Sequence, residues 1–538
     1  MKSRKWIALG MAATMVAAAL AGCGETKQIA SGIIDEVTTP DTYPIETDEV
    51  LTYNVRMDSV LAGEVTSLNE TPFAKELEKR TGIKVEFQHP TVGQEHESFN
   101  LMIASGEYPD IFETNWYNNA GGPASAFNDG VIIPLNDVIE KVSPNMKALL
   151  EKDPTLKKDI SVNGDIYCYP SYREGNLGAT YYGVMARKDL LDEIGMAVPE
   201  TIDEWEAVLT ALKDKVEYPL YIRLEPTWLS SSSNVLVGAY GIGGAFYVDD
   251  GVVKYGPYEK EFKNWVEKMA DWYKKGLINT DFAKPDSNAV SSNFVNGNIG
   301  MTIASNGSEF GTWLPILREN VDGAELVPVP YPVLNKGDYP EFGQKSKSTN
   351  GYGGSISTQC KNIELAARLL DYGYSEEGQM LFGLGIEGTT YELKDGVPQY
   401  LPLVTDSQKL QNKSMAQVLS LYARNTAAAP YLGAEKNRKV HSAAWYAEPA
   451  QYEAATVWGQ TKAEEHALPN LAMSDEDSNR LSALVGDIYT YTDEHVVNMI
   501  NGVDSLDGYD AFVAGLEQMN IKEALEIYQR AYDDYMNE

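Results

Sequence analysis

The sequence predicts an α/β fold, because strand-type and helix-type patterns alternate at the start of its folded part. Apolar residues alternate with polar ones in "LTYNVRM", from Leu51 to Met57, which is typical of a strand. "TPFAKELEKRTG" follows with a helical pattern, and "IKVEFQ" alternates again from Ile83 to Phe87. A strand, a helix and a second strand within about forty residues form a βαβ unit, so we expect a parallel sheet.

The helix between these two strands carries local signals for its start and its end. Thr71 is a suitable N-cap residue, Pro72 suits the first turn, and Gly82 can end the helix in a left-handed conformation. Phe73 and Leu77 are spaced to share one face, which can be buried against the sheet. These features predict an amphipathic helix packed on the first two strands.

Later segments continue the alternation. A helix is expected from about Phe99 to Gly106, and "YPDIFE" has the composition of the next strand. "VPETIDEWEAVLTAL" begins with a capping box of Thr201 and Glu204. The apolar stripe of that helix comprises Trp205, Val208, Leu209 and Leu212. A helix is also expected at the C-terminus, where one face comprises Ile521, Leu525, Tyr528 and Tyr532.

The N-terminus has the order of a secretory signal. Basic residues precede an apolar run from Trp6 to Leu20, and small residues close the run. The run is too short and too Ala-rich for a membrane span, which needs roughly 20 apolar residues. Cys23 directly follows, and Leu-Ala-Gly-Cys resembles the bacterial lipobox, in which the cysteine is diacylated. We therefore expect residues 1–22 to be a lipoprotein signal peptide and Cys23 to be lipidated; a plain signal peptide is the alternative.

The length and net charge of the chain limit the number of domains and the kinds of partner that can be expected. The 538 residues are enough for two or more large domains, and no later apolar run is long enough to span a membrane. The net charge of −34 argues against nucleic acid and anionic lipid as general partners, because Lys and Arg must neutralise phosphates. Residues 23–47 show no sustained period, so we expect a flexible spacer with a reach of about 25 to 30 Å. Cys168 and Cys360 lie in apolar, strand-like segments, which favours buried free thiols over a disulfide.

The sequence lacks the common motifs of catalysis and cofactor binding. Its five histidines include no pair with the spacing of a zinc-binding helix. The glycines of "YGIGGAF" and "GYGGS" lack the lysine and the spacing of a phosphate loop, and no serine lies in a nucleophile elbow. We expect no cofactor and no enzymatic activity. A glycosidase-type carboxylate pair among the 78 acidic residues stays open as an alternative.

Aromatic side chains are the positive signal. The chain has 9 Trp and 33 Tyr, and several stand beside polar residues or glycine, as in "ETNWYNN", "LEPTWLSS", "SNGSEFGTWL" and "HSAAWYAEP". Sugar rings have apolar C–H faces and hydroxylated edges, so flat aromatic rings combined with polar side chains suit them. Many single rings are expected in the core, because Trp and Tyr are largely buried in most proteins. We expect some of the set to share one cleft.

The motifs, taken in order, are similar to those of the family 1 extracellular solute-binding lipoproteins of ABC importers, particularly the long form of Gram-positive bacteria. "FAKELEKRTGIKVEF" resembles the family's first helix and second strand, and "LMIASGEYPDIFE" its second helix and third strand. "GDIYCYP" resembles the crossing between domains and "NGNIGMTIASNG" a later ligand segment. The resemblance covers essentially the whole mature chain. It implies a two-lobed periplasmic-binding-protein-like fold with hinge strands between the lobes, which close on a ligand.

The resemblance also implies discontinuous lobes and a role in import. The first α/β lobe is expected at 48–170 plus 323–375, and the second at 171–322 plus 376–538 with a helical C-terminal extension. The implied function is capture of an extracellular oligosaccharide and its delivery to the importer's permease subunits, by a monomer anchored through lipid to the outer face of the cell membrane. A surface-anchored glycoside hydrolase or lyase, and an importer protein for a non-sugar solute such as a peptide, are the alternatives.

Comparison with the maltose-binding branch of the family implies a set of ligand contacts. Rings expected to stack on sugars are Trp116, Trp228, Trp313 and Trp445. Groups expected to bond hydroxyls are Asn115, Arg173, Glu174 and Asn306. Tyr172 and Tyr181 complete this set, and Tyr352 and Glu387 are added only because they lie in glycine-flanked loops. Arg173 has a structural alternative, an ion pair in the neighbourhood of Glu174. Some long-form relatives carry a calcium loop where this chain reads "KDKVEYP", and Asp214 and Glu217 supply too few oxygens, so we expect no metal there.

Overall fold

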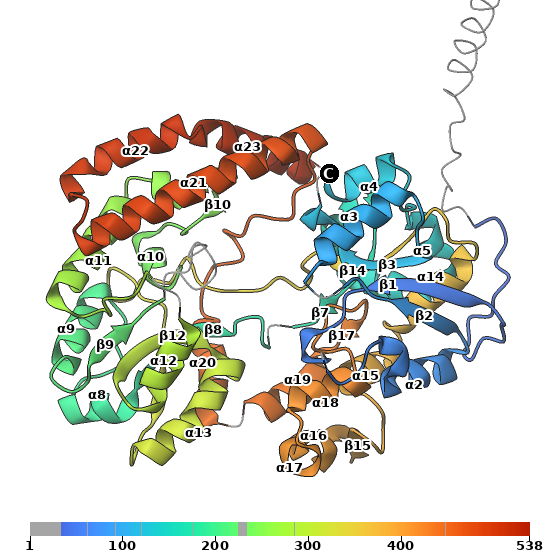
Figure 1. Ribbon diagram of the computed structural model, residues 1–538, viewed down its shortest axis with the longest axis horizontal. Helices are drawn as coiled ribbons and strands as arrows, with labels where there is room; N and C mark the ends of the chain where they lie inside the picture. Colours follow the sequence, from blue (N-terminus) through green and yellow to red (C-terminus); the bar gives the residue numbers. More distant parts are fainter. Residues whose placement is uncertain are drawn as a thin grey trace, which may run out of the picture.

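The computed structural model describes two α/β lobes that lie side by side (Figure 1). The described residues are 34–61, 63–91, 93–119, 121–175, 177–223, 234–283, 286–446 and 448–537. The predictions for the signal peptide, Cys23 and Trp228 therefore lie outside the described residues. Within the described ranges, no helix has both the length and the apolar character needed to cross a membrane.

The first lobe is built on a five-stranded mixed sheet, at the right in Figure 1. In spatial order its strands are β2 (Lys84–Gln88), β1 (Val50–Val55), β3 (Ile111–Asn115), β14 (Tyr352–Ile356) and β6 (Tyr169–Pro170). β1 pairs parallel with both β2 and β3, whereas β14 runs antiparallel to β3 and β6. The predicted βαβ unit is confirmed.

The first-lobe helices form where the local signals place them. α2 (Pro72–Thr81) is capped by the Thr71 side chain, which accepts from the amide of Ala74, and ends at Gly82 with a φ of 74°. The lobe also contains α3 (Glu95–Ser105), α4 (Gly122–Asn128), α5 (Asn136–Val142), α6 (Pro144–Lys152), α7 (Pro154–Asp159) and α14 (Ile363–Tyr372). Phe73 and Leu77 are buried in the core of this lobe, as their spacing predicts.

The second lobe has a four-stranded sheet. Its spatial order is β13 (Leu326–Val329), β8 (Tyr182–Arg187), β12 (Ile299–Ser305) and β9 (Tyr218–Tyr221). The surrounding helices include α8 (Lys188–Ile194), α9 (Ile202–Leu212), α11 (Phe262–Lys275), α12 (Ser287–Val295), α13 (Gly311–Asn320) and α20 (Pro449–Trp458). The capping box of Thr201 and Glu204 is present at the start of α9. Trp458 is fully buried, and its indole N–H points at the carbonyls of Val184 and Val329, at 3.2 and 3.1 Å.

The lobe boundaries differ from those expected. β13 lies within the range 323–375 that was assigned to the first lobe, but it pairs antiparallel with β8 of the second. α15 (Glu376–Leu384), α18 (Met415–Tyr422) and α19 (Glu435–Trp445) were assigned to the second lobe. They belong to the first, because Phe382 packs edge-on against Phe73, with ring centroids 5.0 Å apart, and β17 (Leu432–Gly433) pairs with β7 (Tyr172–Arg173). Long-range pairing decides these boundaries.

The expected spacer is wrong over residues 34–47, which pack on the first lobe. Ile34 and Ile45 are buried, and the Ile34 amide donates to Asp137 at 2.7 Å. The hydroxyl of Tyr43 donates to the carbonyl of Arg368 at 2.6 Å, on α14. The apolar residues of this segment are too few and too irregularly spaced to show a helical or strand period. Ile34 and Ile45 are nevertheless buried against the lobe. Cys168 and Cys360 are free and buried, as predicted.

The C-terminal extension joins both lobes. It consists of α21 (Asp475–Asn501), α22 (Tyr509–Gln518) and α23 (Ile521–Asn537), drawn in red across the top of Figure 1. Its apolar faces belong to the core of the second lobe. Its ends reach the first lobe, where the Tyr535 hydroxyl donates to Asp159 at 2.9 Å and Lys158 lies over the Tyr535 ring at 4.4 Å.

Candidate ligand-binding site

A cavity of about 310 Å³, here called the interlobe cavity, lies where the two lobes meet. Tyr181, Ser305 and Ser308 line it from the second lobe, at the ends of β8 and β12. Arg173 lines it from the segment that crosses between the lobes, and α19 contributes from the first lobe. A ligand in this cavity would touch both lobes and would therefore favour their approach.

One face of α19 supplies most of the first-lobe wall. Arg438, His441, Ser442 and Trp445 all line the cavity, and their spacing of three, four and seven residues places them on one side of the helix. This face of α19 therefore presents the Trp445 ring and the Arg438 charge to the same cavity. Trp445 is half-buried, which leaves part of its indole ring open to the cavity.

Arg438 ties α19 to the crossing segment. Its guanidinium donates to the carbonyls of Glu174 and Leu177 and, at 3.4 Å, to that of Gly175. Burial lowers the pKa of Arg438, and the nearby charge of Arg173 lowers it further. Arg438 is therefore a half-buried cation beside a second cation, and its hydrogen bonds among the described residues go to backbone carbonyls.

His441 is neutral in this site. Burial lowers its pKa to about 4, and the positive charges of Arg438 and Arg173 add to the effect. The Asn425 side chain donates from Nδ2 toward His441 Nδ1 at 3.2 Å and to the Gly383 carbonyl at 2.6 Å. The neutral ring can therefore accept one hydrogen bond and offer one donor.

Three polar atoms around the interlobe cavity have no hydrogen-bond partner among the described residues. They are Asn425 Oδ1, Asn437 Oδ1 and Trp445 Nε1, and each is buried. A buried polar atom without a partner costs about 1 to 3 kcal/mol. Asn437 is only 2% exposed, so its free oxygen lies beyond bulk water. These atoms indicate a wall that a polar ligand can complete.

A second cavity, of about 470 Å³, lies at the carboxyl ends of β1, β2 and β3. Open α/β sheets commonly bind ligands at this edge. Arg56, His89, Glu113 and Tyr352 are among its lining residues. His89 Nδ1 donates to the Val55 carbonyl at 2.9 Å, and burial lowers the pKa of this imidazole. His89 therefore has a structural role in the first lobe.

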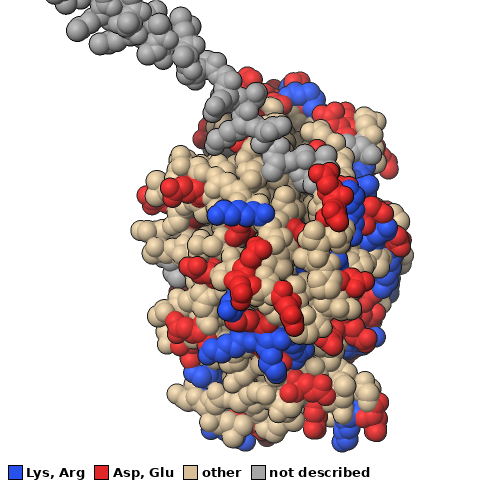
Figure 2. Space-filling model, turned by 90° about the vertical axis from the view of Figure 1, so that its right-hand side faces the viewer, with Lys and Arg blue, Asp and Glu red and all other residues tan. Residues whose placement is uncertain are grey.

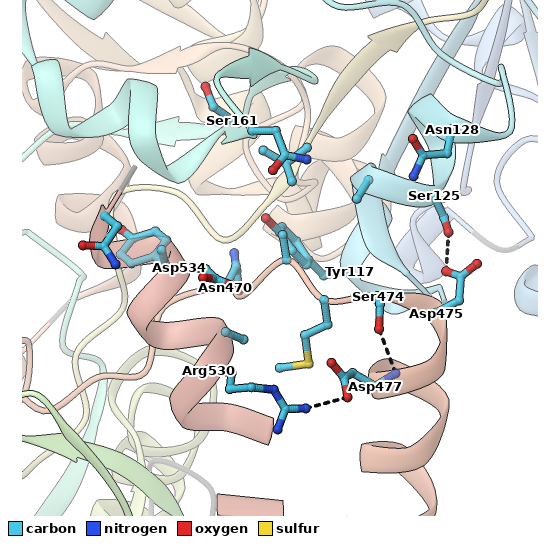
Figure 3. A pocket seen from close by; sticks show the side chains of 18 of the residues that line it. Tyr117, Ser125, Asn128, Ser161, Asn470, Ser474, Asp475, Asp477, Arg530 and Asp534 are labelled. Atoms are coloured by element: carbon cyan, nitrogen blue, oxygen red, sulfur yellow. Dashed lines mark hydrogen bonds and ion pairs between the residues drawn. The ribbon is translucent and has the colours of Figure 1, made fainter. Parts of the chain in front are cut away.

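A third cavity, of about 750 Å³, lies between the first lobe and the C-terminal extension (Figure 3). Its polar groups are largely paired with each other. Ser125 donates to Asp475, and Arg530 donates to Asp477 at 2.8 Å, as the dashed lines in Figure 3 mark. This cavity is an interface between parts of the chain, and Asp475 and Asp477 already have donors there.

The structure brings part of the predicted residue set to the cavities. Arg173, Tyr181 and Trp445 line the interlobe cavity, and Tyr352 lines the first-lobe cavity. Asn306 lies between two lining residues, but it is fully buried, and its Nδ2 donates to the Gln451 carbonyl at 2.7 Å. The alternative for Arg173 is not seen, because its guanidinium has no ion pair with Glu174.

The predicted stacking role is wrong for two tryptophans. Trp116 is 2% exposed, and its indole N–H donates to the Ser355 hydroxyl at 2.9 Å in the first-lobe core. Trp313 is 5% exposed and packs against Phe294 and Phe310 in the second-lobe core. Neither ring presents a face to a ligand here, because each fills its own lobe.

Four further predicted residues point elsewhere. Asn115 donates from Nδ2 to the Asn350 carbonyl at 3.0 Å. Tyr172 is buried and donates to Asp153 at 2.9 Å. Glu174 is paired with Lys152 and accepts from the Glu435 amide at 3.0 Å, so its carboxylate is occupied. Glu387 is exposed in the loop after α15 and lines neither the interlobe nor the first-lobe cavity.

Sequence reasoning missed Asn425, Asn437, Arg438 and His441. The signal for three of them was available in "EKNRKVHSAAW", where polar residues recur every three or four positions before the tryptophan. Nothing in the sequence showed that this helix faces the second lobe across the cavity. Asn425 lies in a loop and had no comparable pattern.

Two lobes, crossing segments between them and a cavity lined from both sides define a hinge-type ligand-binding protein. Residues 66–380 match the family described as bacterial extracellular solute-binding protein, and this match spans more than half of the chain. The chain belongs to that family. Within the described residues, no group of three or more His, Cys, Asp or Glu side chains is arranged to hold a metal ion.

Relatives extend the similarity over nearly the full length. Lipoprotein LipO of Bacillus subtilis (strain 168) is 26% identical over 548 residues, covering 98% of this chain and 95% of LipO. The fructooligosaccharide ABC transporter substrate-binding protein FusA of Streptococcus pneumoniae serotype 4 is 24% identical, covering 96% of each chain. The solved structure of an HMO-binding, ABC-transporter-associated solute-binding protein from Bifidobacterium longum infantis has a TM-score of 0.72 at 21% identity, covering 90% of this chain and 99% of that one.

Proposed function

We propose that this protein is the substrate-binding lipoprotein of an ABC importer and that it captures an extracellular oligosaccharide by lobe closure. One observation carries the proposal, namely the interlobe cavity with polar and aromatic side chains from both lobes. Hydroxyl-bonding groups such as Asn437 and the ring of Trp445 suit a sugar's edge and face. FusA, similar over most of its length, is named for a fructooligosaccharide transporter, which supports the same ligand class.

The cavity supports binding over hydrolysis. Glycosidases use two carboxyl groups about 5 to 9.5 Å apart on either side of the bond they cleave. Among the described residues that line the interlobe cavity, none is Asp or Glu. The nearest candidate from the sequence, Glu174, is engaged by Lys152 and a backbone amide.

A glycan panel tests this function. Purified protein is incubated with oligosaccharides of two to six residues, and both the melting temperature and the release of reducing sugar are measured. We expect a rise in melting temperature with at least one oligosaccharide and no product. Product formation, or stabilisation by peptides but by no oligosaccharide, would contradict the proposal.

The anchor is the second part of the proposal. Cys23 is diacylated and becomes the first residue of the mature chain when residues 1–22 are removed, and it holds a monomer on the outer face of the cell membrane near the permease subunits. One acyl chain binds a membrane only marginally, so two chains are needed for a stable anchor. The name of LipO, a lipoprotein by its description, supports this assignment. Residues 34–47 pack on the first lobe, so they do not contribute to the reach of a tether.

Replacing Cys23 with Ser tests the anchor. Cys23→Ser protein should appear in the culture medium with unchanged affinity for the ligand found in the panel. Retention at the cell surface would contradict lipid attachment at this residue. Loss of ligand binding would contradict the separation of anchor and binding site.

A further inference from the structure

Arginines at the candidate site differ from those on the rest of the surface. Figure 2, which views the molecule from the side of the first lobe, shows acidic and basic side chains interspersed. Exposed Arg480, for example, pairs with Glu523 at 2.6 Å. Arg56 in the first-lobe cavity, and Arg173 and Arg438 in the interlobe cavity, form no ion pair with a carboxylate among the described residues. This is notable in a chain with 78 acidic residues and 44 basic ones.

Arg173 and Arg438 line the same cavity, and neither forms an ion pair with a carboxylate among the described residues; the charge of Glu435 acts on Arg438 from a greater distance. Arg438 is held by backbone carbonyls, and the Arg173 side chain has no hydrogen-bond partner among the described residues. The two positive charges repel each other; burial is the main cause of the lowered pKa of Arg438, and the charge of Arg173 adds to it. An anion placed between them would offset this repulsion and give the exposed Arg173 guanidinium a partner, while the Arg438 guanidinium stays held by the carbonyls of the crossing segment. The folded protein therefore holds a preformed cationic site.

The rest of the wall selects a hydroxylated anion. A guanidinium binds a carboxylate through two parallel N–H···O bonds, which gives strength and direction. The free oxygens of Asn425 and Asn437 can accept from hydroxyl groups, and Tyr181 and Trp445 offer ring faces. A simple inorganic anion would use the arginines alone. A neutral sugar would use the wall and leave the two charges uncompensated.

We propose that the ligand is an acidic oligosaccharide, whose uronic or sialic acid carboxylate binds between Arg173 and Arg438. This inference rests on the proposed function and narrows its ligand class. It also predicts that salt weakens binding, because the attraction is between charges that are partly open to solvent. At physiological ionic strength the screening length is about 8 Å.

Matched pairs of sugars test the ligand class. Trigalacturonate is compared with galactotriose, an oligomannuronate with the mannose oligomer of equal length, and sialyllactose with lactose, by isothermal titration calorimetry of the purified protein. For at least one pair we expect the acidic member to bind at least about tenfold more tightly, equivalent to about 1.4 kcal/mol. Its affinity should also fall between 50 and 500 mM NaCl.

Three variants separate charge from hydrogen bonding. Arg173→Gln keeps donors but removes the charge, and it should abolish the preference for the acidic member. Arg173→Lys keeps the charge, and it should retain most of that preference. Lys439→Gln is the matched control, because Lys439 is 64% exposed on the same helix and pairs with Glu435, away from the interlobe cavity. It should leave affinity unchanged.

The possible results separate failure of the acidic-ligand inference from failure of the proposed oligosaccharide-binding function. If sugars bind but in no pair does the acidic member bind more tightly than its neutral partner, or if Arg173→Gln keeps the preference, the inference is wrong and oligosaccharide capture stands. If no member of any pair binds, the inference is wrong and the oligosaccharide function itself is contradicted. Circular dichroism of each variant shows whether a lost preference reflects loss of folding.

Discussion

Removal of Arg424 should strongly destabilise the first lobe. Its Nη2 donates to Glu113 Oε1 at 2.7 Å, and the side chains are 6% and 5% exposed. Tyr53 donates to the other carboxylate oxygen at 2.9 Å. Glu113 stands on β3, and Arg424 follows α18, so this ion pair fastens the segment carrying α19 to the central sheet. The wall of the interlobe cavity therefore depends on a buried charge pair.

The structure sets the size of the effect. Arg424→Ala leaves the Glu113 carboxylate buried with only the Tyr53 hydroxyl, and breaking a buried pair in this way costs about 3 to 5 kcal/mol. Arg480→Ala removes an exposed pair, whose side chains are 46% and 41% accessible, and should cost under about 1 kcal/mol. Replacing both partners, with Glu113→Gln and Arg424→Met, should cost less than Arg424→Ala alone because no charge is left unpaired.

Urea unfolding measures all three variants. Circular dichroism and tryptophan fluorescence are followed together, because two lobes can unfold in separate steps and Trp116 reports on the first. For Arg424→Ala we expect the unfolding transition of the first lobe to shift to a lower urea concentration. The reasoning is refuted if Arg424→Ala costs no more than Arg480→Ala, or if the double replacement is the least stable of the three.

Two further predictions concern the second lobe and the C-terminal extension. A Cβ on Gly183 would lie 2.3 Å from the buried Trp458 ring, so Gly183→Ala should lower the free energy of unfolding by about 1 to 3 kcal/mol. The control Gly486→Ala, whose Cβ would have nothing within 4 Å, should leave stability unchanged. Equal melting temperatures of the two variants would contradict this prediction. Burial raises the pKa of Asp493 from 3.8 to about 7, so its ionisation disfavours folding, and the stability it contributes is lost as pH rises from about 4 to 7. Asp493→Asn should therefore raise the melting temperature relative to the parent more at pH 8 than at pH 5, and a pH-independent difference would count against the assignment.

Local elements could be predicted from the sequence because their signals are local. Thr71, Pro72 and Gly82 sit where α2 begins and ends, and the capping box at Thr201 opens α9. The lobe boundaries could not be predicted in this way. They depend on β13 joining β8 and on β14 joining β3, pairings between residues far apart in the chain that leave no mark in either segment. The packing of residues 34–47 is hidden for the same reason.

The residues of the candidate site also could be predicted only in part from the sequence. Trp116 and Trp445 both stand beside polar residues in the sequence, yet one is a core residue and the other borders a cavity. The distinction lies in their partners. Trp116 follows a central strand and lies among Phe99 and Phe112, whereas Trp445 ends a helix at the boundary between lobes. The residues next to a tryptophan in the sequence therefore do not show whether its ring lies in a core or beside a cavity.

The positions of the cavity residues relative to the hinge give them different parts in capture. Arg173 stands on a crossing segment and Arg438 is bonded to that segment's carbonyls, so we expect both to keep their places relative to each other when the lobes move. A ligand held by these two gains the same free energy in either state, and such contacts cannot drive closure. Ser305 and Ser308 sit on the second lobe and line the same cavity as α19, so we expect their contacts with a ligand to be lost when the lobes separate. Affinity would then come chiefly from the arginines at the hinge, and the closed state that a permease can recognise would come from the weaker contacts across the cavity.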